Sequence, residues 1–139
     1  MKRPDPPGLV IRYNYLWYYD KIRGLAVGDK DRPCAIVIAS RQSGAVTVVP
    51  IIHSYPDPGE EALSIEVPCD VAKEISLDDD VNDVKLEVNR FERSGDHSRP
   101  LPNDPNRVDY GMLPKEFFIE VRKRLADLVR SNLLRQTKR

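Results

Sequence analysis

The sequence predicts a protein that is mainly β with some α-helix: a small antiparallel barrel followed by a C-terminal amphipathic helix. Five short apolar segments are separated by turn-forming residues, a spacing typical of small antiparallel β proteins. An apolar stripe at helical spacing follows them. A chain of 139 residues is long enough for one hydrophobic core. We therefore expect a loose N-terminal arm over residues 1–8, which hold three prolines and a glycine, and a single domain over residues 9–139.

The first half of the domain is expected to contribute three strands. Residues 8–19 alternate apolar and polar side chains and are dense in aromatics, which predicts the first strand. The polar residues 20–31 predict a loop. The apolar runs 33–40 and 45–50 predict two further strands, and the polar turn 41–44 between them indicates a hairpin.

The second half is expected to alternate short strands with two helical segments. Residues 62–67 alternate as a fourth strand, and residues 68–75 suit one or two helical turns. Residues 84–91 alternate again and predict the fifth strand. Residues 92–109 are rich in proline, asparagine and aspartate, which predicts a long loop. An amphipathic helix is expected over 114–134, with one apolar stripe made of Phe117, Val121, Leu125, Leu128 and Val129.

Composition argues against several classes of protein. No apolar run approaches the roughly 18 residues that a membrane-spanning helix needs, and residues 1–7 lack the apolar core of a secretory signal. We therefore expect a cytoplasmic protein with no membrane partner. Cys34 and Cys69 are far apart and have no CxxC spacing. We expect two reduced, mostly buried thiols rather than a disulfide or a zinc site, and no cofactor.

The charges balance overall but are spread unevenly along the chain. Lys and Arg total 22, as do Asp and Glu, so the formal net charge is zero. Residues 57–87 hold 11 acidic and 2 basic side chains, whereas residues 115–139 hold 8 basic and 3 acidic ones. Either these regions offset each other within the fold or across a dimer, or the basic part forms a surface for RNA. The sequence leaves both interpretations open.

The hairpin carries a polar group at the matching ends of its two strands. Arg32 directly precedes the first strand, and His53 and Ser54 follow the second. If the strands pair, these side chains lie towards the same end of the sheet. A guanidinium grips two phosphate oxygens, and an imidazole, whose ordinary pKa is about 6.5, moves a proton near neutral pH. This combination suits the cleavage of RNA without a metal ion.

The motifs around this hairpin resemble those of the MazF/PemK toxins of bacterial toxin–antitoxin systems. The resemblance runs in order along nearly the whole chain, through PGLVIRY (7–13), DRPCAIVI (31–38), VVPIIHS (48–54), EVNRF (87–91) and DYGMLP (109–114). It implies an SH3-like barrel with a C-terminal helix, assembled as a homodimer. It also implies a metal-independent endoribonuclease that cleaves single-stranded RNA and is neutralised by an acidic, partly disordered cognate antitoxin peptide.

The resemblance also implies roles for individual residues. It makes Arg32 the cation that stabilises the attacked phosphate, His53 the general base or acid, and Ser54 a donor to a phosphate oxygen. Each has a structural alternative: Arg32 pairs with a neighbouring aspartate, His53 is structural, and Ser54 caps a turn. Packing in the barrel or in a dimer face is the alternative for the aromatics, and ion pairing with a nearby glutamate is the alternative for Arg90. The candidates for RNA binding are Arg12, Trp17, Arg23 and Arg90.

Two positions depart from the family pattern. Ile52 stands where the family has a threonine whose hydroxyl contacts phosphate, and Leu86 stands where an acid is usual. Glu87 is a possible replacement acid, although strand alternation directs Leu86 and Glu87 to opposite faces. A second candidate function is therefore a catalytically degenerate barrel that binds RNA or an antitoxin-like peptide without cleaving. A third is a peptide-binding scaffold that uses Trp17 and the nearby tyrosines.

Overall fold

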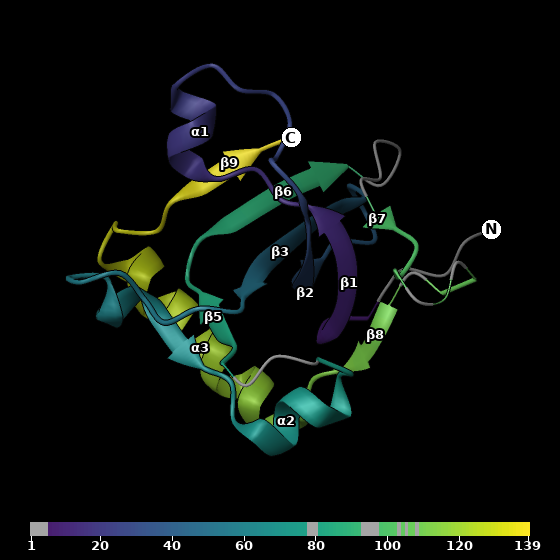
Figure 1. Ribbon diagram of the computed structural model, residues 1–139. Coiled ribbons are helices and arrows are strands. Elements are labelled where there is room, and N and C mark those ends of the chain that lie inside the picture. The colour runs from purple at the N-terminus through teal and green to yellow at the C-terminus, as the bar shows by residue number, and fades with distance from the viewer. Residues whose placement is uncertain (1–5, 78–80, 93–97, 103, 105, 108) are drawn as a thin grey trace.

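The computed structural model describes residues 6–77, 81–92, 98–102, 104, 106–107 and 109–139. Over these residues the chain is mainly β with α, as predicted: a nine-stranded sheet is accompanied by three α-helices and one short 3-10 helix (Figure 1). In chain order the elements are β1 (Leu9–Asn14), α1 (Tyr18–Ile22), β2 (Asp31–Ala39), β3 (Ala45–Ile52), η1 (Glu61–Leu63), β4 (Ser64–Glu66), α2 (Cys69–Glu74), β5 (Asp83–Lys85), β6 (Val88–Glu92), β7 (Ser98–Arg99), β8 (Asp109–Met112), α3 (Lys115–Arg130) and β9 (Gln136–Lys138).

The predicted hairpin of β2 and β3 forms the centre of the sheet. β2 pairs antiparallel with β3 on one edge and with β1 on the other. The second edge of β3 is shared by two strands, because β6 pairs with residues 45–48 and β5 with residues 51–52. The C-terminal end of β3 therefore lies between β2 and β5, and His53 is the first residue after the strand.

Among the described residues the sheet does not close into a complete ring. β7 and β8 pair with β1 on one side of the path, whereas β4 pairs with β5 and β9 pairs with β6 on the other. β9 runs parallel to β6, and the remaining described pairs are antiparallel. The first strand of the chain, β1, and the last, β9, thus lie in the same sheet (Figure 1).

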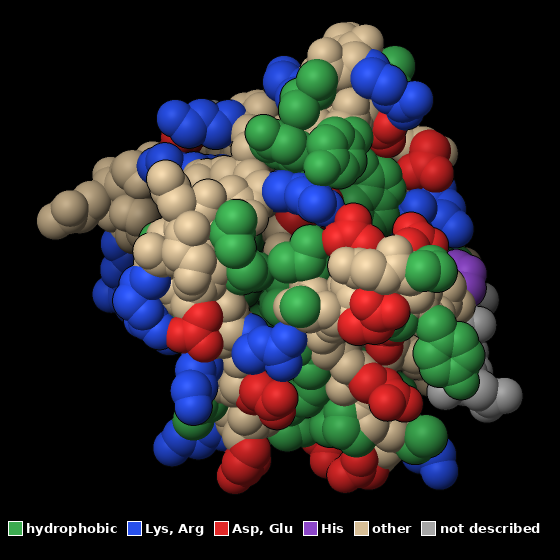
Figure 2. Space-filling view, turned by 90° about the vertical axis from the view of Figure 1, so that its left-hand side faces the viewer, with side chains coloured by type: hydrophobic (Ala, Val, Ile, Leu, Met, Phe, Trp, Pro, Cys, Tyr) green, Lys and Arg blue, Asp and Glu red, His purple; other side chains and the backbone are tan. Residues whose placement is uncertain are grey.

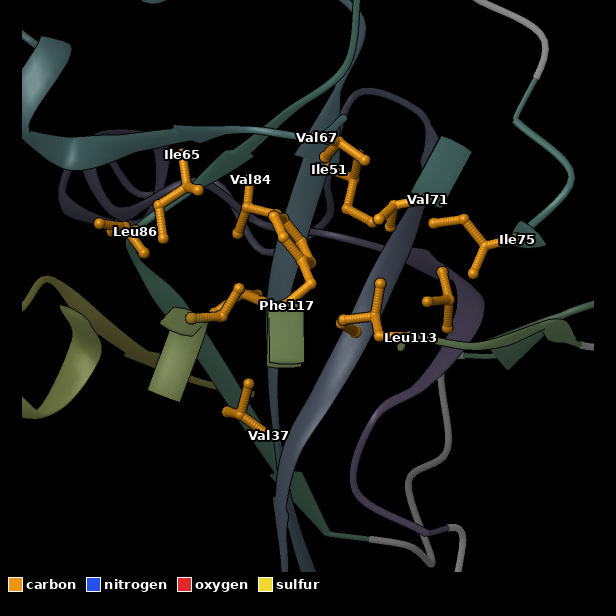
Figure 3. Packing of buried hydrophobic residues seen from close by; sticks show 14 of the residues in the cluster. Val37, Ile51, Ile65, Val67, Val71, Ile75, Val84, Leu86, Leu113 and Phe117 are labelled. Atoms are coloured by element: carbon orange, nitrogen blue, oxygen red, sulfur yellow. The ribbon is translucent and has the colours of Figure 1, made fainter. Parts of the chain in front are cut away.

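The larger core lies between the sheet and the helices α2 and α3. Figure 3 shows Val84 and Leu86 of the β5 region facing Phe117 of α3, with Val71 of α2 in the same cluster. Phe117, Val121 and Leu125 are buried as the helical stripe predicts, but Val129 is 59% exposed because it lines an open groove beside the sheet. None of the helices in the described ranges has both the length and the apolar character that a membrane-spanning segment requires.

A second core cluster contains the tyrosines of the first strand. Tyr13 and Tyr15 are fully buried with Cys34, Ile36 and apolar side chains of β3 and β6. The Tyr13 ring stacks on Phe91 at a centroid distance of 4.9 Å. Of the two roles that the sequence left open for the aromatics, RNA binding and packing, these two tyrosines therefore have the packing role.

The first strand is shorter than the predicted span 8–19. β1 ends at Asn14, and α1 follows after three residues. The cause is tertiary, because side chains of the β6 region bind the backbone here in place of a strand partner. Asn89 accepts a hydrogen bond from the Leu16 amide at 2.9 Å and donates to the Leu16 carbonyl at 2.8 Å, and Glu87 accepts one from the Tyr18 amide at 3.1 Å.

The predicted fifth strand is also wrong in detail. Residues 84–91 fall in two strands, β5 and β6, which are separated at Leu86 and Glu87. Glu87 and Asn89 were expected on a polar face, but both are buried, because they bind the segment after β1. Leu86 belongs to the larger core, so the two neighbouring side chains do point to different surroundings.

Near the termini the structure adds short pairings that no sequence pattern indicated. The helix predicted to residue 134 ends at Arg130 and is followed by β9, and the predicted loop 92–109 contains β7 and the first residue of β8. Residues 93–97, 103, 105 and 108 of that loop, like residues 1–5 of the predicted arm, lie outside the described residues. The last residue of the arm is held in place, since the Gly8 amide donates to the Ile36 carbonyl at 2.7 Å.

Candidate functional site

A pocket of about 420 Å³ lies where β2 begins and β3 ends, and we call it the Arg32 pocket. It brings Arg32 and His53 into one site, as the hairpin pairing predicts. The rest of its wall comes from the end of α2 and from the segment before β8. Its lining residues are Lys30, Asp31, Arg32, Pro33, Ile51, His53, Ser76, Leu77, Leu101, Pro102, Asp104, Arg107 and Tyr110.

Arg32 is held firmly at the pocket wall. Its side chain is only 12% exposed and pairs with Asp29 at 3.4 Å. Its guanidinium carbon lies 5.2 Å from the centroid of the Trp17 ring, which is a cation–π contact. Arg32 Nε is buried and has no hydrogen-bond partner among the described residues. The guanidinium is therefore oriented by an ion pair and a ring, and it retains a hydrogen-bond donor that the described chain does not use.

His53 and Ser54 lie at the open end of this site. Both follow β3 directly and are exposed. His53 lines the Arg32 pocket, whereas Ser54 is not among the lining residues. The structure thus brings two of the three predicted catalytic residues into one pocket and leaves Ser54 beside it.

Among the further polar residues in the Arg32 pocket that the sequence analysis did not indicate are Lys30, Arg107 and Tyr110. Lys30 lies two residues before Arg32, Arg107 lies shortly before β8, and Tyr110 belongs to β8. Arg107 also pairs with Asp109 at 3.7 Å. Only the position of Lys30 close to Arg32 gave a signal in the sequence, because the approach of Arg107 and Tyr110 depends on the pairing of β8 with β1.

The end of α2 completes the pocket wall through an unusual backbone conformation. Ser76 has a φ of 56°, in the left-handed region, and follows Ile75, the residue that caps α2 at its C-terminal end. The Ser76 amide donates to the Lys73 carbonyl and the Leu77 amide to the Ala72 carbonyl, a common way of ending a helix. This turn places Ser76 and Leu77 in the pocket lining.

Glu87, the possible acid, lies in a different pocket. This second pocket, of about 270 Å³, is called the Trp17 pocket, and Ile52 lines it too. Glu87 is 3% exposed, and its Oε2 accepts hydrogen bonds from Tyr15 Oη at 2.9 Å and from the Tyr18 amide. Burial raises the pKa of Glu87 above its ordinary value, although these two bonds partly offset the effect. The lining residues are Trp17, Tyr19, Ile52, Asp57, Glu60, Lys85, Glu87 and Arg135.

The predicted RNA-binding residues are spread over several surfaces. Trp17 connects the two pockets through its contact with Arg32. Arg12 pairs with Asp31 at 3.7 Å and donates to the Pro100 carbonyl, so it fixes the rim of the Arg32 pocket. The other two do not line either pocket: Arg23 pairs with Asp20 on α1, and Arg90 lies in a shallow pocket beside Arg139.

The donor set of the described residues suits an anion better than a metal ion. Within the described ranges no group of three or more His, Cys, Asp or Glu side chains is arranged to hold a metal. Three cations, Lys30, Arg32 and Arg107, and one imidazole line the Arg32 pocket together with two aspartates. Both cysteines are free thiols: Cys34 is buried as expected, but Cys69 is exposed, because it begins α2 on the surface.

Comparison with known proteins gives no independent assignment. No protein-family model matches this chain, and no curated protein matches it significantly in sequence. The functional argument therefore rests on the motifs and on the geometry of the two pockets.

Proposed function

We propose that this protein is a MazF/PemK-like toxin, a metal-independent endoribonuclease that cleaves single-stranded RNA. The observation that carries the proposal is the shared pocket of Arg32 and His53. A guanidinium is the side chain best suited to grip a phosphate in two places, and an imidazole is the one best suited to move protons near neutral pH. Two separate motifs supply these residues, and both lie at the same end of the central hairpin.

In the proposed reaction the substrate supplies its own nucleophile. His53 takes the proton of a ribose 2′-hydroxyl, and the 2′-oxygen attacks the neighbouring phosphorus. The bond from phosphorus to the 5′-oxygen then breaks, which leaves a 2′,3′-cyclic phosphate. Arg32 stabilises the extra negative charge on the phosphate oxygens. The leaving 5′-oxygen takes a proton from solvent, which reaches the exposed end of the pocket at His53.

The same proposal extends to the fold and to the partners. We assign the open, mainly antiparallel sheet and α3 to an SH3-like barrel with a C-terminal helix, in a cytoplasmic homodimer. The partner is a cognate antitoxin peptide of acidic, partly disordered character, which competes with RNA. The cationic lining of the Arg32 pocket supports both of these ligands, because both are anionic.

A specific observation favours the second function, a degenerate barrel that binds RNA without cleaving it. Ile52, at the family's threonine position, supplies no hydroxyl and lines the Trp17 pocket rather than the Arg32 pocket. Glu87 likewise does not share a pocket with His53. If the proton transfers need these two groups, only the binding of RNA remains.

Incubation of the protein with a long single-stranded RNA in EDTA tests the proposal. We expect cleavage to continue and the products to end in 2′,3′-cyclic phosphate, because only side chains take part in the proposed steps. Strict dependence on magnesium contradicts the mechanism and the assignment to this family. Binding of the RNA without cleavage, weakened by Arg32→Ala, supports the degenerate barrel. Unchanged binding in Arg32→Ala removes both RNA functions and leaves the peptide scaffold.

A further inference from the structure

The Trp17 pocket contains aromatic and charged side chains that take no part in the proposed cleavage steps. It lies between α1, the end of β3, the start of β6 and the residue before β9. Figure 2 looks onto the side of the molecule that carries α1 and η1, and it shows hydrophobic side chains next to basic ones in the upper part of this face. Trp17 is half-buried here, and Tyr19 is 56% exposed. Arg32 packs on the Trp17 ring and Arg135 lies 4.9 Å from the Tyr19 centroid, so a ligand would stack on what these guanidinium groups leave open of the two rings, beside a buried carboxylate.

Glu87 presents one oxygen that the protein does not use. Both of its hydrogen bonds, from Tyr15 Oη and the Tyr18 amide, end on Oε2. Oε1 receives neither bond, and it is not among the buried atoms that lack a partner, so it reaches the space of the pocket that Glu87 lines. A carboxylate oxygen that faces a pocket beside aromatic rings favours a flat ligand that carries an N–H group.

The charges around the pocket narrow the choice of ligand. A buried carboxylate together with Asp57 and Glu60 on the lining opposes a phosphate. Lys85 and Arg135 on the same lining oppose a cationic side chain such as lysine. A neutral planar ring is repelled neither by the acidic nor by the basic side chains of the lining. Nucleobases stack on aromatic side chains with about 1–3 kcal/mol each and present donors at their edges.

We propose that the Trp17 pocket binds a nucleobase that carries an exocyclic amino group, with Trp17 and Tyr19 as stacking surfaces and Glu87 Oε1 as the acceptor. Arg32 joins this pocket to the Arg32 pocket, since it lines the latter and packs on Trp17. A phosphate in one pocket and a base in the other then belong to the same RNA strand. This site selects the cleaved sequence, and in that respect it rests on the proposed function.

Trp17 is the chain's one tryptophan, so its fluorescence reports on the pocket directly. We would titrate the protein with cytidine and N4,N4-dimethylcytidine, and with adenosine and N6,N6-dimethyladenosine. Each dimethylated partner keeps the ring but lacks the amino hydrogens, whereas uridine and inosine carry ring N–H donors of their own. We expect cytidine and adenosine to quench Trp17 with a Kd about 10- to 150-fold lower than their dimethylated partners, the factor that corresponds to roughly 1.5–3 kcal/mol for one hydrogen bond to a charged group.

Glu87→Gln provides the sharpest variant. The amide oxygen of glutamine still accepts the bonds from Tyr15 and Tyr18, while its NH₂ group takes the place of Oε1 and turns an acceptor into a donor. We expect the preference for cytidine over N4,N4-dimethylcytidine to disappear. Glu120→Gln, an exposed carboxylate on α3, should leave it unchanged. Far-UV circular dichroism confirms that each variant is folded.

The outcomes separate this inference from the proposed function. Equal quenching by cytidine and N4,N4-dimethylcytidine, an unchanged preference in Glu87→Gln, or tighter binding of N-acetyl-lysinamide than of cytidine each overturns the nucleobase site, even if RNA is cleaved. A preference for amino-bearing bases that Glu87→Gln removes supports the site. That result holds even if no RNA is cleaved, in which case the ribonuclease proposal fails alone.

Discussion

The guanidinium of Arg32 combines three contacts that a lysine cannot reproduce together. It pairs with Asp29, packs on Trp17 and lines the pocket that also holds His53. Arg32→Lys keeps the charge but loses the planar fork and the ring contact. We expect the single-turnover rate of RNA cleavage to fall by about 10²–10³-fold, the usual cost of losing one preorganised donor.

Arg32→Ala should abolish cleavage and weaken RNA binding, measured by gel mobility shift. Arg130→Ala is the matched control, because Arg130 is an exposed arginine of α3 that pairs with Asp127 away from the pocket. Equal losses in the Arg32 and Arg130 variants would show that general charge, rather than the site, binds the RNA.

Glu87 makes folding stability depend on pH in a predictable direction. Burial raises the pKa of this carboxyl in the folded chain above its value in the unfolded chain. The folded chain then holds the proton more tightly, so its stability is greatest below the unfolded-state pKa and falls as pH rises through the folded-state pKa. Glu87→Gln removes this loss. We therefore expect its Tm to exceed that of the wild type by an amount that grows from about pH 4 to about pH 7.

Thermal unfolding of both proteins at several pH values measures this difference. Burial also raises the pKa of Asp83, but Asp83 is present in both proteins and cancels in the comparison. A Tm difference that does not change with pH would mean that Glu87 carries no raised pKa in the folded protein.

At the residue scale the sequence predicted the site only where local pairing determines it. Arg32 and His53 meet because they flank two strands that form a hairpin, and hairpins are visible in a sequence. Arg107 reaches the same pocket from a segment that pairs with β1, almost a hundred residues earlier in the chain. The alternation of the predicted fifth strand places Glu87 opposite Leu86, but nothing in its neighbourhood indicates that Tyr15 and Tyr18 bind it.

The segment between β1 and β2 is positioned by buried hydrogen bonds rather than by apolar packing alone. Asn14 links the two ends of this segment, because its side-chain oxygen accepts a hydrogen bond from the Gly28 amide at 2.9 Å. A Cβ at Gly28 would lie 2.0 Å from the Tyr15 carbonyl oxygen, so only glycine fits there. Asn89, which is fully buried, holds Leu16 through both of its backbone groups. Trp17 therefore owes its position beside Arg32 to a side chain of β6.

Asn89→Ala should loosen this whole segment. It leaves the amide and the carbonyl of Leu16 buried without partners, at a cost of about 1–3 kcal/mol for each. We expect a loss of roughly 2–4 kcal/mol in the free energy of unfolding and faster amide hydrogen exchange over residues 15–28. Lys138→Ala, an exposed position on β9, is the control. Unchanged exchange in Asn89→Ala would show that α1 is held by other contacts.

The elements that the sequence predicted well are those whose pattern is repeated locally. β2, β3 and the first turns of α3 have enough consecutive residues to show their period. β9 has three residues and is defined by the parallel pairing of Gln136, Thr137 and Lys138 with β6, so no local pattern announces it. Arg139 comes directly after β9, and its guanidinium donates to the Asn14 side chain and to the Ala26 carbonyl.

On the scale of the whole molecule, part of the charge asymmetry is neutralised within the fold. Arg135 pairs with Glu60 at 3.4 Å, and Arg124 donates to the Ala62 carbonyl at 3.1 Å, so the basic C-terminal region lies against the acidic middle region. Figure 2 shows acidic and basic side chains interspersed on this face. In the proposed function the local cations of the Arg32 pocket attract the anionic ligand.

An apolar groove of about 430 Å³ lies between α3 and the β2–β3 hairpin. Ile38 and Val129 line it and are 55% and 59% exposed. Apolar side chains exposed side by side usually mark an interface. A homodimer about a two-fold axis, as the proposed function requires, covers such a groove on both protomers with one contact.

We therefore expect sedimentation equilibrium to give twice the chain mass of 15.9 kDa near neutral pH. Ile38→Glu should shift this mass to that of one chain, because a charge in the groove is desolvated when the second protomer binds. Ile22→Glu, an equally exposed apolar position on α1, should leave the dimer intact. A mass of one chain for the wild type at high micromolar concentration contradicts the dimer. An equal effect of both substitutions places the interface away from the groove. Because α3 contributes Leu125 to the core and Val129 to this groove, a two-fold contact here would couple assembly of the dimer directly to the packing of the domain.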